Sequence, residues 1–300
     1  MTKNPLARRD FLRSLAMTGA TYWAAGACAA EPTAEGLKEP VHRVAKAAKS
    51  EAVPVNAAAA GHPLDPALTL ARNSLKQFDN IKDYTCRITK QERIKNVLGP
   101  TEQMEAKIRN RKTENGKIVT PLSVYLRFIS PSNIEGREVI WVEGQNENKL
   151  RAHEGGFKGK LLPSVWLHPE GVLAMNGNLH PIYDIGIENL VLKLIERGER
   201  ELKYPECDVK FIEGAKINGR GCTVLEVTHP IQRPHFEFFK AQVFIDDAMQ
   251  MPVRYAAYHW PEKPADKEGP VLEAYTYTNV KLNVGLTDAD FDSNNVNYKY

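Results

Sequence analysis

The stretch LSVYLRFIS, residues 122–130, alternates between apolar and polar side chains. Its even-numbered positions from 122 to 128 are apolar, whereas Ser123, Tyr125 and Arg127 occupy the positions between them. Successive side chains of a β-strand point to opposite faces of a sheet. This stretch therefore predicts a strand that has one face against a core and the other face in water.

The same kind of pattern recurs on both sides of this stretch. Asn-Gly pairs at residues 115–116 and 218–219 mark tight turns of the kind that join the strands of a hairpin. Such short connections favour antiparallel pairing of neighbouring strands. The expected strands lie within residues 84–94, 101–112, 122–130, 137–144, 149–155, 207–214, 221–229, 236–246, 251–260 and 271–283.

Two amphipathic helices interrupt the strands. Between residues 65 and 78, and again between residues 187 and 195, apolar side chains recur at spacings of three and four. Asp65 is expected to cap the first helix, with Pro66 at its first position. Two helices are few for a sheet of about ten strands, so we expect the sheet to curve around them as an incomplete barrel. The predicted fold class is α+β, a large curved antiparallel sheet covered by a few helices.

The N-terminal residues predict export. Arg8 and Arg9 stand before an apolar pair and a further arginine, an order that resembles the twin-arginine export signal. A mildly apolar stretch and small residues follow, so residues 1–30 are expected to form a signal peptide. Residues 31–63 are rich in Ala, Pro, Lys and Glu and predict a disordered tether. A single domain is expected over residues 64–300.

The four cysteines leave two questions open. Cys28 follows Ala-Gly-Ala, which fits a lipidation box without its usual leucine and equally fits cleavage after small residues. A lipid on Cys28 would be the only membrane attachment that we expect. Cys207 and Cys222 flank one predicted hairpin and are candidate disulfide partners in an exported protein. A two-residue turn at residues 218–219 would instead pair Cys222 with Ala215, which excludes this disulfide.

The charge of the chain argues against a nucleic-acid partner. Four of the 40 basic and one of the 37 acidic side chains lie in residues 1–30, so the remainder of the chain has equal numbers of both. Domains that bind nucleic acid normally carry a strongly basic surface. No nucleic-acid partner is therefore expected.

Two pairs of residues offer acid–base chemistry. His153 and Glu154 are adjacent, and neighbouring residues of a strand point to opposite faces. His180 and Asp184 could orient a base, but Asp184 also suits the cap of the helix that follows. We favour structural roles for both pairs, and a hydrolase that uses either pair is the alternative.

The remaining chemistry of the sequence is sparse. His229 and His235 are six residues apart without a third ligand at a suitable spacing, so no metal is expected. The sequence contains neither a Gly-x-Ser-x-Gly elbow nor a glycine-rich phosphate loop. We therefore expect no catalytic residues and no cofactor.

Several phrases resemble a family of exported bacterial proteins that is known as a domain of unknown function. They include YTCRITKQERI (84–94), the phrase SVYLRFISPSNIEGREVIWVEGQNENKLRAHEGG (123–156) and LAMNGNLHPIYDIGIENLVLKLIERGER (173–200), and they extend to PVRYAAYHWP (252–261) and YTYTNVKLNVGLTDADFD (275–292). That family is similar in its plan to the outer-membrane lipoprotein carrier superfamily, a half-barrel sheet over helices. The resemblance implies a periplasmic fold that holds acyl chains or hydrophobic segments.

These observations predict a non-enzymatic envelope protein. Its partner would be a hydrophobic ligand, an acyl chain or a lipidated protein, bound in an apolar cavity between the sheet and the helices. The expected cavity lies near Leu190 and Leu194 and is bounded by Phe239 and Val243, although core packing is the default role for these strand residues. Alternatives are a module that docks another envelope protein and an unrecognised hydrolase.

Overall fold

The computed structural model describes residues 41–42, 61–263 and 268–300. Arg8, Arg9 and Cys28, and with them the expected signal peptide and most of the expected tether, lie outside these residues. No helix within the described ranges is long and apolar enough to cross a membrane.

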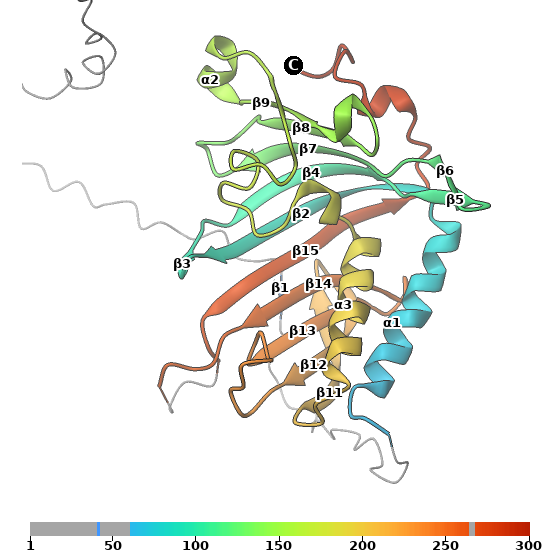
Figure 1. Cartoon of the computed structure of the whole chain (residues 1–300), viewed down its shortest axis with the longest axis vertical. Helices are drawn as coiled ribbons and strands as arrows, with labels where there is room; N and C mark the ends of the chain where they lie inside the picture. The colour runs from blue at the N-terminus through green and yellow to red at the C-terminus, as the bar shows by residue number, and fades with distance from the viewer. Residues whose placement is uncertain (1–40, 43–60, 264–267) are drawn as a thin grey trace, which may run out of the picture. The chain divides into compact units, whose positions relative to one another are not determined.

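One large antiparallel sheet dominates the described residues (Figure 1). Strand β3 (Val97–Leu98) extends β2 outside the main order, and β5 (Lys112–Glu114) and β6 (Lys117–Thr120) form a separate hairpin. In spatial order the main strands are β1 (Val41–His42), β11 (Asp208–Ile217), β12 (Arg220–Thr228), β13 (Lys240–Asp246), β14 (Met251–Tyr258), β15 (Val271–Leu282), β2 (Asp83–Ile94), β4 (Glu102–Arg109), β7 (Ser123–Ser130), β8 (Glu138–Val142), β9 (Leu150–His153) and β10 (Val165–Leu167).

The sheet consists of two meanders that share one seam. Strands β2 to β10 follow each other in space nearly as they do along the chain, and so do β11 to β15. The last strand, β15, pairs with the first long strand, β2, where Thr276 faces Thr89. Both expected Asn-Gly turns are confirmed: Asn218 and Gly219 have φ values of 49° and 80°, as a two-residue hairpin turn requires.

Two long helices cover one face of the sheet. Figure 1 shows α1 (Asp65–Gln77) and α3 (Ile187–Glu201) side by side across strands β11 to β15. The remaining helical segments are short: α2 (Gly156–Leu161), η1 (Phe78–Asn80), η2 (Asn146–Asn148), η3 (Ile182–Asp184) and η4 (Asp288–Phe291). The predicted α+β class, an incomplete barrel of antiparallel strands over a few helices, is confirmed.

Both helix starts differ from the expectation. Helix α1 begins at Asp65, and its N-cap is Leu64, because the Asp65 carboxylate accepts a hydrogen bond from the His62 N–H at 2.8 Å. Helix α3 follows Gly186, whose φ of 126° suits glycine alone. Asp184 is therefore two residues too early to cap α3, and its carboxylate is free for other contacts.

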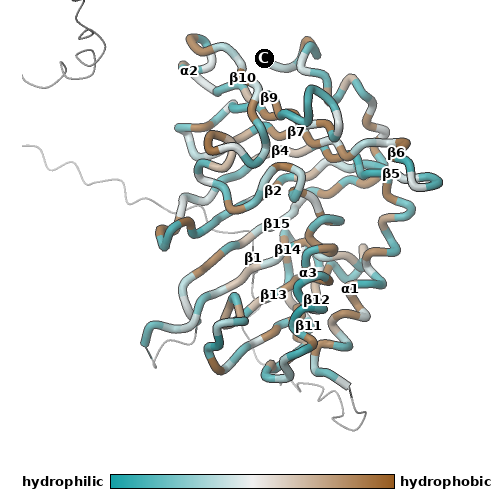
Figure 2. The backbone as a smooth tube through the Cα atoms, viewed as in Figure 1, coloured by the Kyte–Doolittle hydropathy of each residue, from teal (hydrophilic) through white to brown (hydrophobic). Residues whose placement is uncertain are grey.

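The face of the sheet opposite the helices is drier than the sequence pattern predicts. Val124 and Leu126 face the core on the helix-covered side of the sheet, as expected, but Tyr125 on the other face is only 5% exposed. The C-terminal segment covers it, and the ring of Tyr298 stacks on the ring of Tyr125 at 4.3 Å. Strands β13 and β14 are buried on both faces. Figure 2 shows hydrophobic residues recurring along strands and helices.

Candidate functional site

An apolar cavity lies between α1, α3 and strands β12 to β14. Its volume is about 80 Å³. Leu68 of α1 and Leu194 of α3 form one wall, and Ala241, Val243 and Ile245 of β13 form the opposite wall. These odd-numbered residues of β13 share one face because the strand alternates as predicted. The cavity therefore lies between the sheet and the helices, beside Leu194 and Val243.

The structure brings together only some of the four residues that were predicted to line the cavity. Leu194 and Val243 line the apolar cavity, and Leu190 lines a neighbouring polar cavity. Phe239 lines neither of them. Strand β13 begins at Lys240, so residues 236–239 do not follow its alternation, and Phe238 fills the wall instead with 3% of its surface exposed.

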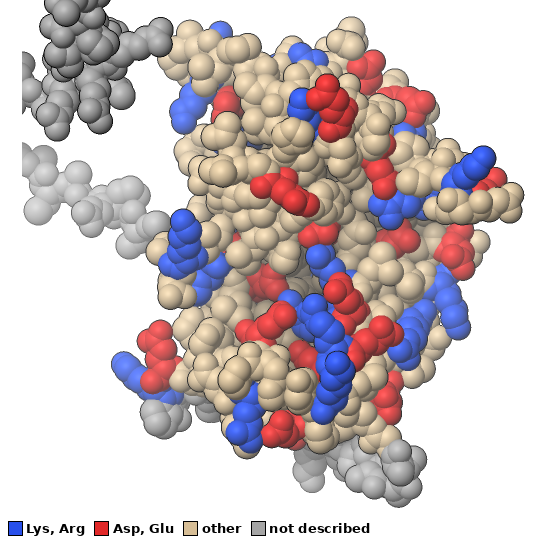
Figure 3. Space-filling model, in the orientation of Figure 1, with Lys and Arg blue, Asp and Glu red and all other residues tan. Residues whose placement is uncertain are grey.

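A second cavity, of about 90 Å³, lies beside the first, under the N-terminal half of α3. Its lining is rich in ionisable side chains, whereas that of the first cavity is mostly aliphatic and aromatic and includes only Arg197, Glu201 and Tyr255 among ionisable residues. Figure 3 shows acidic and basic residues gathered over α3 beside a hollow. The polar side chains that line this cavity are Lys90, Glu92, Asn178, His180, Asp184, Lys193, Arg197, Tyr255, Glu273, Tyr275 and Tyr277.

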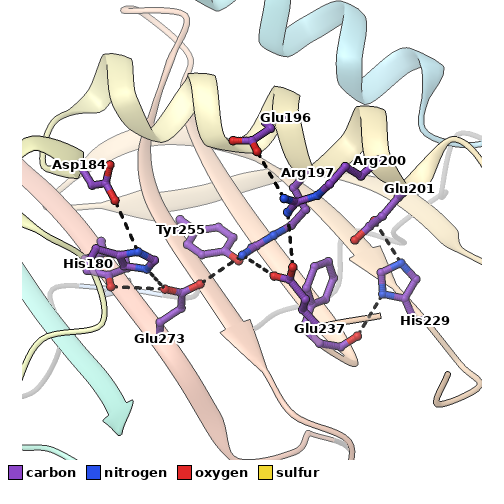
Figure 4. Close-up of polar contacts among 12 residues, drawn as sticks. His180, Asp184, Glu196, Arg197, Arg200, Glu201, His229, Glu237, Tyr255 and Glu273 are labelled. Carbon is purple, nitrogen blue, oxygen red and sulfur yellow. Dashed lines mark hydrogen bonds and ion pairs between the residues drawn. The ribbon is translucent and has the colours of Figure 1, made fainter. Parts of the chain in front are cut away.

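Arg197 separates the two cavities, and it lines both of them together with Leu194 and Tyr255. Its guanidinium donates a hydrogen bond to the Tyr255 hydroxyl, and Nη2 lies 2.9 Å from a Glu237 carboxylate oxygen and 3.8 Å from Glu273 (Figure 4). The pKa of Arg197 is raised, because the charges of these partners outweigh its burial. Arg197 therefore remains a cation at the boundary.

His180 lies between two carboxylates at the other end of the polar cavity. Its Nε2 is 2.8 Å from Glu273 Oε2, and its Nδ1 is 3.9 Å from Asp184 Oδ2 (Figure 4). Asp184 also pairs with Lys193 of α3 at 2.9 Å. The side chain that was expected to cap α3 thus belongs to a charge network, in which His180 lies between Asp184 and Glu273.

Glu273 is the centre of this network. Burial by itself raises the pKa of its carboxyl, but the hydrogen bond and charge of His180, the charge of Arg197 and the Tyr275 hydroxyl together hold the pKa below its ordinary value. Glu273 is also the direct cross-strand neighbour of Glu92. Like charges in such positions are destabilising, so their cationic and hydroxyl partners are required here.

Glu92 obtains its partners from three segments. The Tyr275 hydroxyl donates to Glu92 Oε1 at 2.5 Å, and the Leu179 N–H donates to Oε2 at 3.1 Å. The ammonium of Lys90 lies 3.4 Å from Glu92 and 3.1 Å from Glu102. Burial, reinforced by the two nearby carboxylates, raises the pKa of Tyr275, which keeps its hydroxyl a donor.

The remaining candidates for acid–base chemistry or metal binding have structural surroundings. Glu154 pairs with Arg137 at 3.0 Å. His229 is fully buried, stacks on Phe236 at 3.8 Å and lies 3.3 Å from Glu201. His235 stacks on Tyr204.

Cys207, Cys222 and the two candidate metal ligands lie within the described residues. The described residues contain no group of three or more His, Cys, Asp or Glu side chains that could hold a metal ion. Cys207 and Cys222 are free thiols, so the candidate disulfide is wrong. Cys222 pairs with Ala215 near the hairpin turn, and Cys207 precedes Asp208, which pairs with Thr228 at the far end. Six residues of strand separate these positions by about 20 Å, beyond the reach of a disulfide.

The sequence reasoning missed Arg197 and Glu273. Arg197 follows Leu194 by one helical turn and so continues the inward stripe of α3, which is a signal that the pattern contained. Glu273 occupies an inward position of β15, like Tyr275 and Tyr277. Its partner residues come from other parts of the chain, so only the fold brings them together.

The curved antiparallel sheet and the helices on one of its faces define an α+β half-barrel with two cavities between the sheet and the helices. The chain belongs to the family described as Protein of unknown function (DUF1571), whose model matches residues 81–300. The resemblance drawn from the sequence phrases is thereby confirmed. No curated protein matches the sequence.

Solved structures with a similar course of the chain have distant sequences. Lipoprotein LppX of Mycobacterium tuberculosis is 15% identical, with a TM-score of 0.41, over 76% of this chain and 100% of that one. The Pseudomonas aeruginosa MucA/MucB complex matches at 13% identity and a TM-score of 0.38, over 76% and 61%. A LolA superfamily protein of Nitrosomonas europaea matches at 9% identity and a TM-score of 0.29, over 74% and 97%.

Proposed function

We propose that this protein is exported to the cell envelope and there binds an acyl chain, free or attached to a lipidated partner, without catalysing a reaction. The apolar cavity carries this proposal. Its walls are aliphatic and aromatic, and it lies under two helices that contact each other along one edge. Largely apolar cavities with a few polar groups at one end are typical small-molecule sites.

The cavity must widen to admit such a ligand. Its volume of about 80 Å³ is smaller than the ~150 Å³ cavity that admits benzene. The Cβ position of Gly198 on α3 has Leu68 of α1 as its nearest neighbour, so these helices touch through small and aliphatic groups. Separation of α1 from α3 would open the cavity without breaking a strand pair.

The expected affinity is modest. Burial of about ten methylenes contributes roughly 8 kcal/mol, from which ordering of the chain and loss of free tumbling subtract several kcal/mol. The cost of moving α1 reduces the affinity further. We therefore expect binding in the micromolar range or weaker, which suits a carrier that releases its cargo.

Uptake of a fluorescent fatty-acyl probe tests the proposal. Ala241 is 5% exposed on the cavity wall, and Ala241→Leu adds three carbons that occupy the space of the ligand. We expect at least tenfold weaker uptake by Ala241→Leu. Ala248→Leu, in the exposed turn between β13 and β14, is the matched control and should bind as the unmodified chain does.

A second variant places a charge in the cavity. Val243→Glu should abolish uptake, provided that circular dichroism first shows a folded protein. If the folded unmodified chain takes up no probe and yields no lipid on solvent extraction, the carrier proposal is wrong.

Docking of another envelope protein is the second candidate. Large apolar side chains are exposed around α2 and β10, among them Phe157 at 75%, Leu161 at 67% and Trp166 at 45%. Strand β10 is also the edge of the sheet in the described residues, and exposed edges accept further strands. A stable complex with a purified envelope protein, lost on Phe157→Ser with Leu161→Ser, would favour this function.

A further inference from the structure

A pocket larger than either cavity lies away from both of them. Its volume is about 540 Å³, against 80 and 90 Å³ beneath the helices. Ile140 and Val142 of β8 form part of its floor, whereas Trp141 between them belongs to the core on the helix-covered side of the sheet. The pocket is therefore on the opposite face of the sheet. We call it the outer-face pocket.

The wall of the outer-face pocket is made from three distant segments. The turn between β8 and β9 supplies Asn146 and Lys149, β10 supplies Trp166, and the C-terminal segment around η4 supplies Asp288 and Ser293. Figure 1 shows the C-terminal segment at the same end of the sheet as β7, β8 and β9. A volume of this size lies in the range of small-molecule sites, roughly 300–1,000 Å³.

Arg151 of β9 is the main feature of this pocket. Its Nε donates to Ser164 Oγ at 2.9 Å and its Nη1 donates to Ser293 Oγ at 2.6 Å. The rings of Trp166 and Tyr300 flank the guanidinium, with their centroids 5.5 and 5.4 Å from Cζ. Neutral hydroxyls and aromatic rings thus hold its orientation.

The charge of Arg151 is not neutralised by an acid. Across residues 61–263 and 268–300 it forms no ion pair, and its Nη2 donates to no other group. Three of the five N–H donors of the guanidinium remain, and its fork matches a carboxylate. Of the two acids of the pocket, Asp288 pairs with Arg109 at 2.6 Å, whereas Asp292 accepts hydrogen bonds on Oδ1 from the backbone N–H and the side-chain amide of Asn294 and keeps its charge.

We propose that the outer-face pocket binds an acidic sugar, with its carboxylate on Arg151. Trp166 is 45% exposed and offers a flat surface to the C–H groups of a sugar ring. Within the part of the chain that the structure describes, the side-chain amides of Gln145 and Asn146 form no hydrogen bond and can reach sugar hydroxyls. Lys149 adds positive charge to the rim, where its own partner is the exposed Glu147.

Calorimetric titration of the full chain tests this assignment with four probes. They are a trigalacturonate, the neutral trisaccharide maltotriose, glucose 6-phosphate and inorganic phosphate, each at 50 mM salt. We expect trigalacturonate to bind at least tenfold more tightly than maltotriose, because only the former supplies a carboxylate. Higher salt should weaken the binding of trigalacturonate and leave that of maltotriose unchanged.

Variants identify the site. Arg151→Gln should weaken trigalacturonate binding at least tenfold, and Trp166→Ala, at an exposed ring that supports little of the fold, about threefold. Arg233→Gln removes the same charge from an exposed loop, where Arg233 pairs with Glu206, and should leave binding within twofold. Thermal unfolding confirms that each variant is folded.

Several results would overturn the proposal. They are equal binding of maltotriose, unchanged binding by both Arg151→Gln and Trp166→Ala, or no binding of trigalacturonate to the folded chain. Binding of inorganic phosphate or glucose 6-phosphate as tight as that of trigalacturonate would assign the pocket to phosphate and reject the acidic sugar. Uptake of the acyl probe is independent of these outcomes.

Discussion

The apolar cavity and the polar cavity lie under the same helix but are built by opposite means. In the first, α3 faces β12 to β14, and the opposing side chains are aliphatic or aromatic. In the second, α3 faces β15 and β2, where Glu273 and Glu92 are cross-strand neighbours. One region is held by burial of apolar surface, and the other by cations and hydroxyls that neutralise two inward carboxylates.

The two cavities differ in what their linings cost the fold. A packed apolar wall is the default for a protein core and by itself indicates no ligand. Two carboxylates placed opposite each other inside a fold are costly. The polar cavity therefore imposes a cost on the fold that the apolar cavity does not, and the partners of the two carboxylates must offset it. The following predictions test whether the two regions depend on different forces.

Phe238→Ala should have the largest effect on stability. Phe238 is 3% exposed, lines the apolar cavity and lies 5.7 Å from the guanidinium of Arg197. Removal of a buried phenylalanine costs about 3–5 kcal/mol in the free energy of unfolding. Phe239→Ala, at a half-buried neighbour outside both cavities, should cost about 1 kcal/mol. Equal losses for the two variants in urea denaturation would contradict the assignment of Phe238 to the wall.

Arg197→Met should have the second-largest effect, a loss of about 3 kcal/mol in the free energy of unfolding, because it leaves Glu273 buried without this partner. This is the lower end of the range for a broken buried pair, since Glu237 on the other side is 55% exposed. Arg200→Met is the control on the same helix: Arg200 is 58% exposed and should contribute less than about 0.5 kcal/mol. A loss below 1 kcal/mol for Arg197→Met would show that the boundary is not electrostatic.

Glu273→Gln should have a smaller effect that depends on pH. Its lowered folded pKa contributes stability above the unfolded value of 4.5, and this stability is lost as the pH falls through the folded pKa. The variant should be about 2 kcal/mol less stable near pH 7, from weaker charge-assisted hydrogen bonds. The difference should shrink below pH 4.5. Urea denaturation at a series of pH values measures it, and a difference that grows in acid would contradict the role of Glu273.

Gly198→Ala should have the smallest effect on stability and a clear effect on the cavity. The added Cβ would lie 2.8 Å from Leu68 Cδ2, the movable end of that side chain. Because the apolar cavity lies beside Leu68, the side chain can rotate into it. The gain in helix propensity, about 1 kcal/mol, should offset the cost of moving the Leu68 side chain. The free energy of unfolding should therefore change by less than about 1 kcal/mol. Acyl-probe uptake should fall, and unchanged uptake would contradict the position of the ligand.

The sequence predicted repeating features better than single positions. Alternation along residues 122–130 and 241–245 placed the inward faces correctly, and spacings of three and four found both long helices. These patterns repeat along one element, so neighbouring residues confirm each other. Phe239 was misplaced because the alternation was extended one residue beyond the start of β13. Asp184 was misplaced because a cap depends on where a single turn ends.

These local patterns could not predict which distant segments pair with each other. Nothing local in residues 271–282 shows that Glu273 faces Glu92, because this depends on the β15–β2 seam that joins the two meanders. The free cysteines follow likewise from hairpin register, which places Cys222 opposite Ala215. The burial of Tyr125 required the C-terminal segment to fold back over the outer face.

The sequence by itself determined the class of this protein: an antiparallel sheet curved over two amphipathic helices, with an apolar space between them. It could do so because hydrophobic periodicity is a local property of each segment. The tertiary structure alone decided what surrounds that space. Long-range strand pairing brought Arg197, His180, Glu273 and Glu92 into one network, and chain closure at the C-terminus made the outer-face pocket around Arg151. Both depend on contacts between residues up to about two hundred positions apart, which no local pattern records.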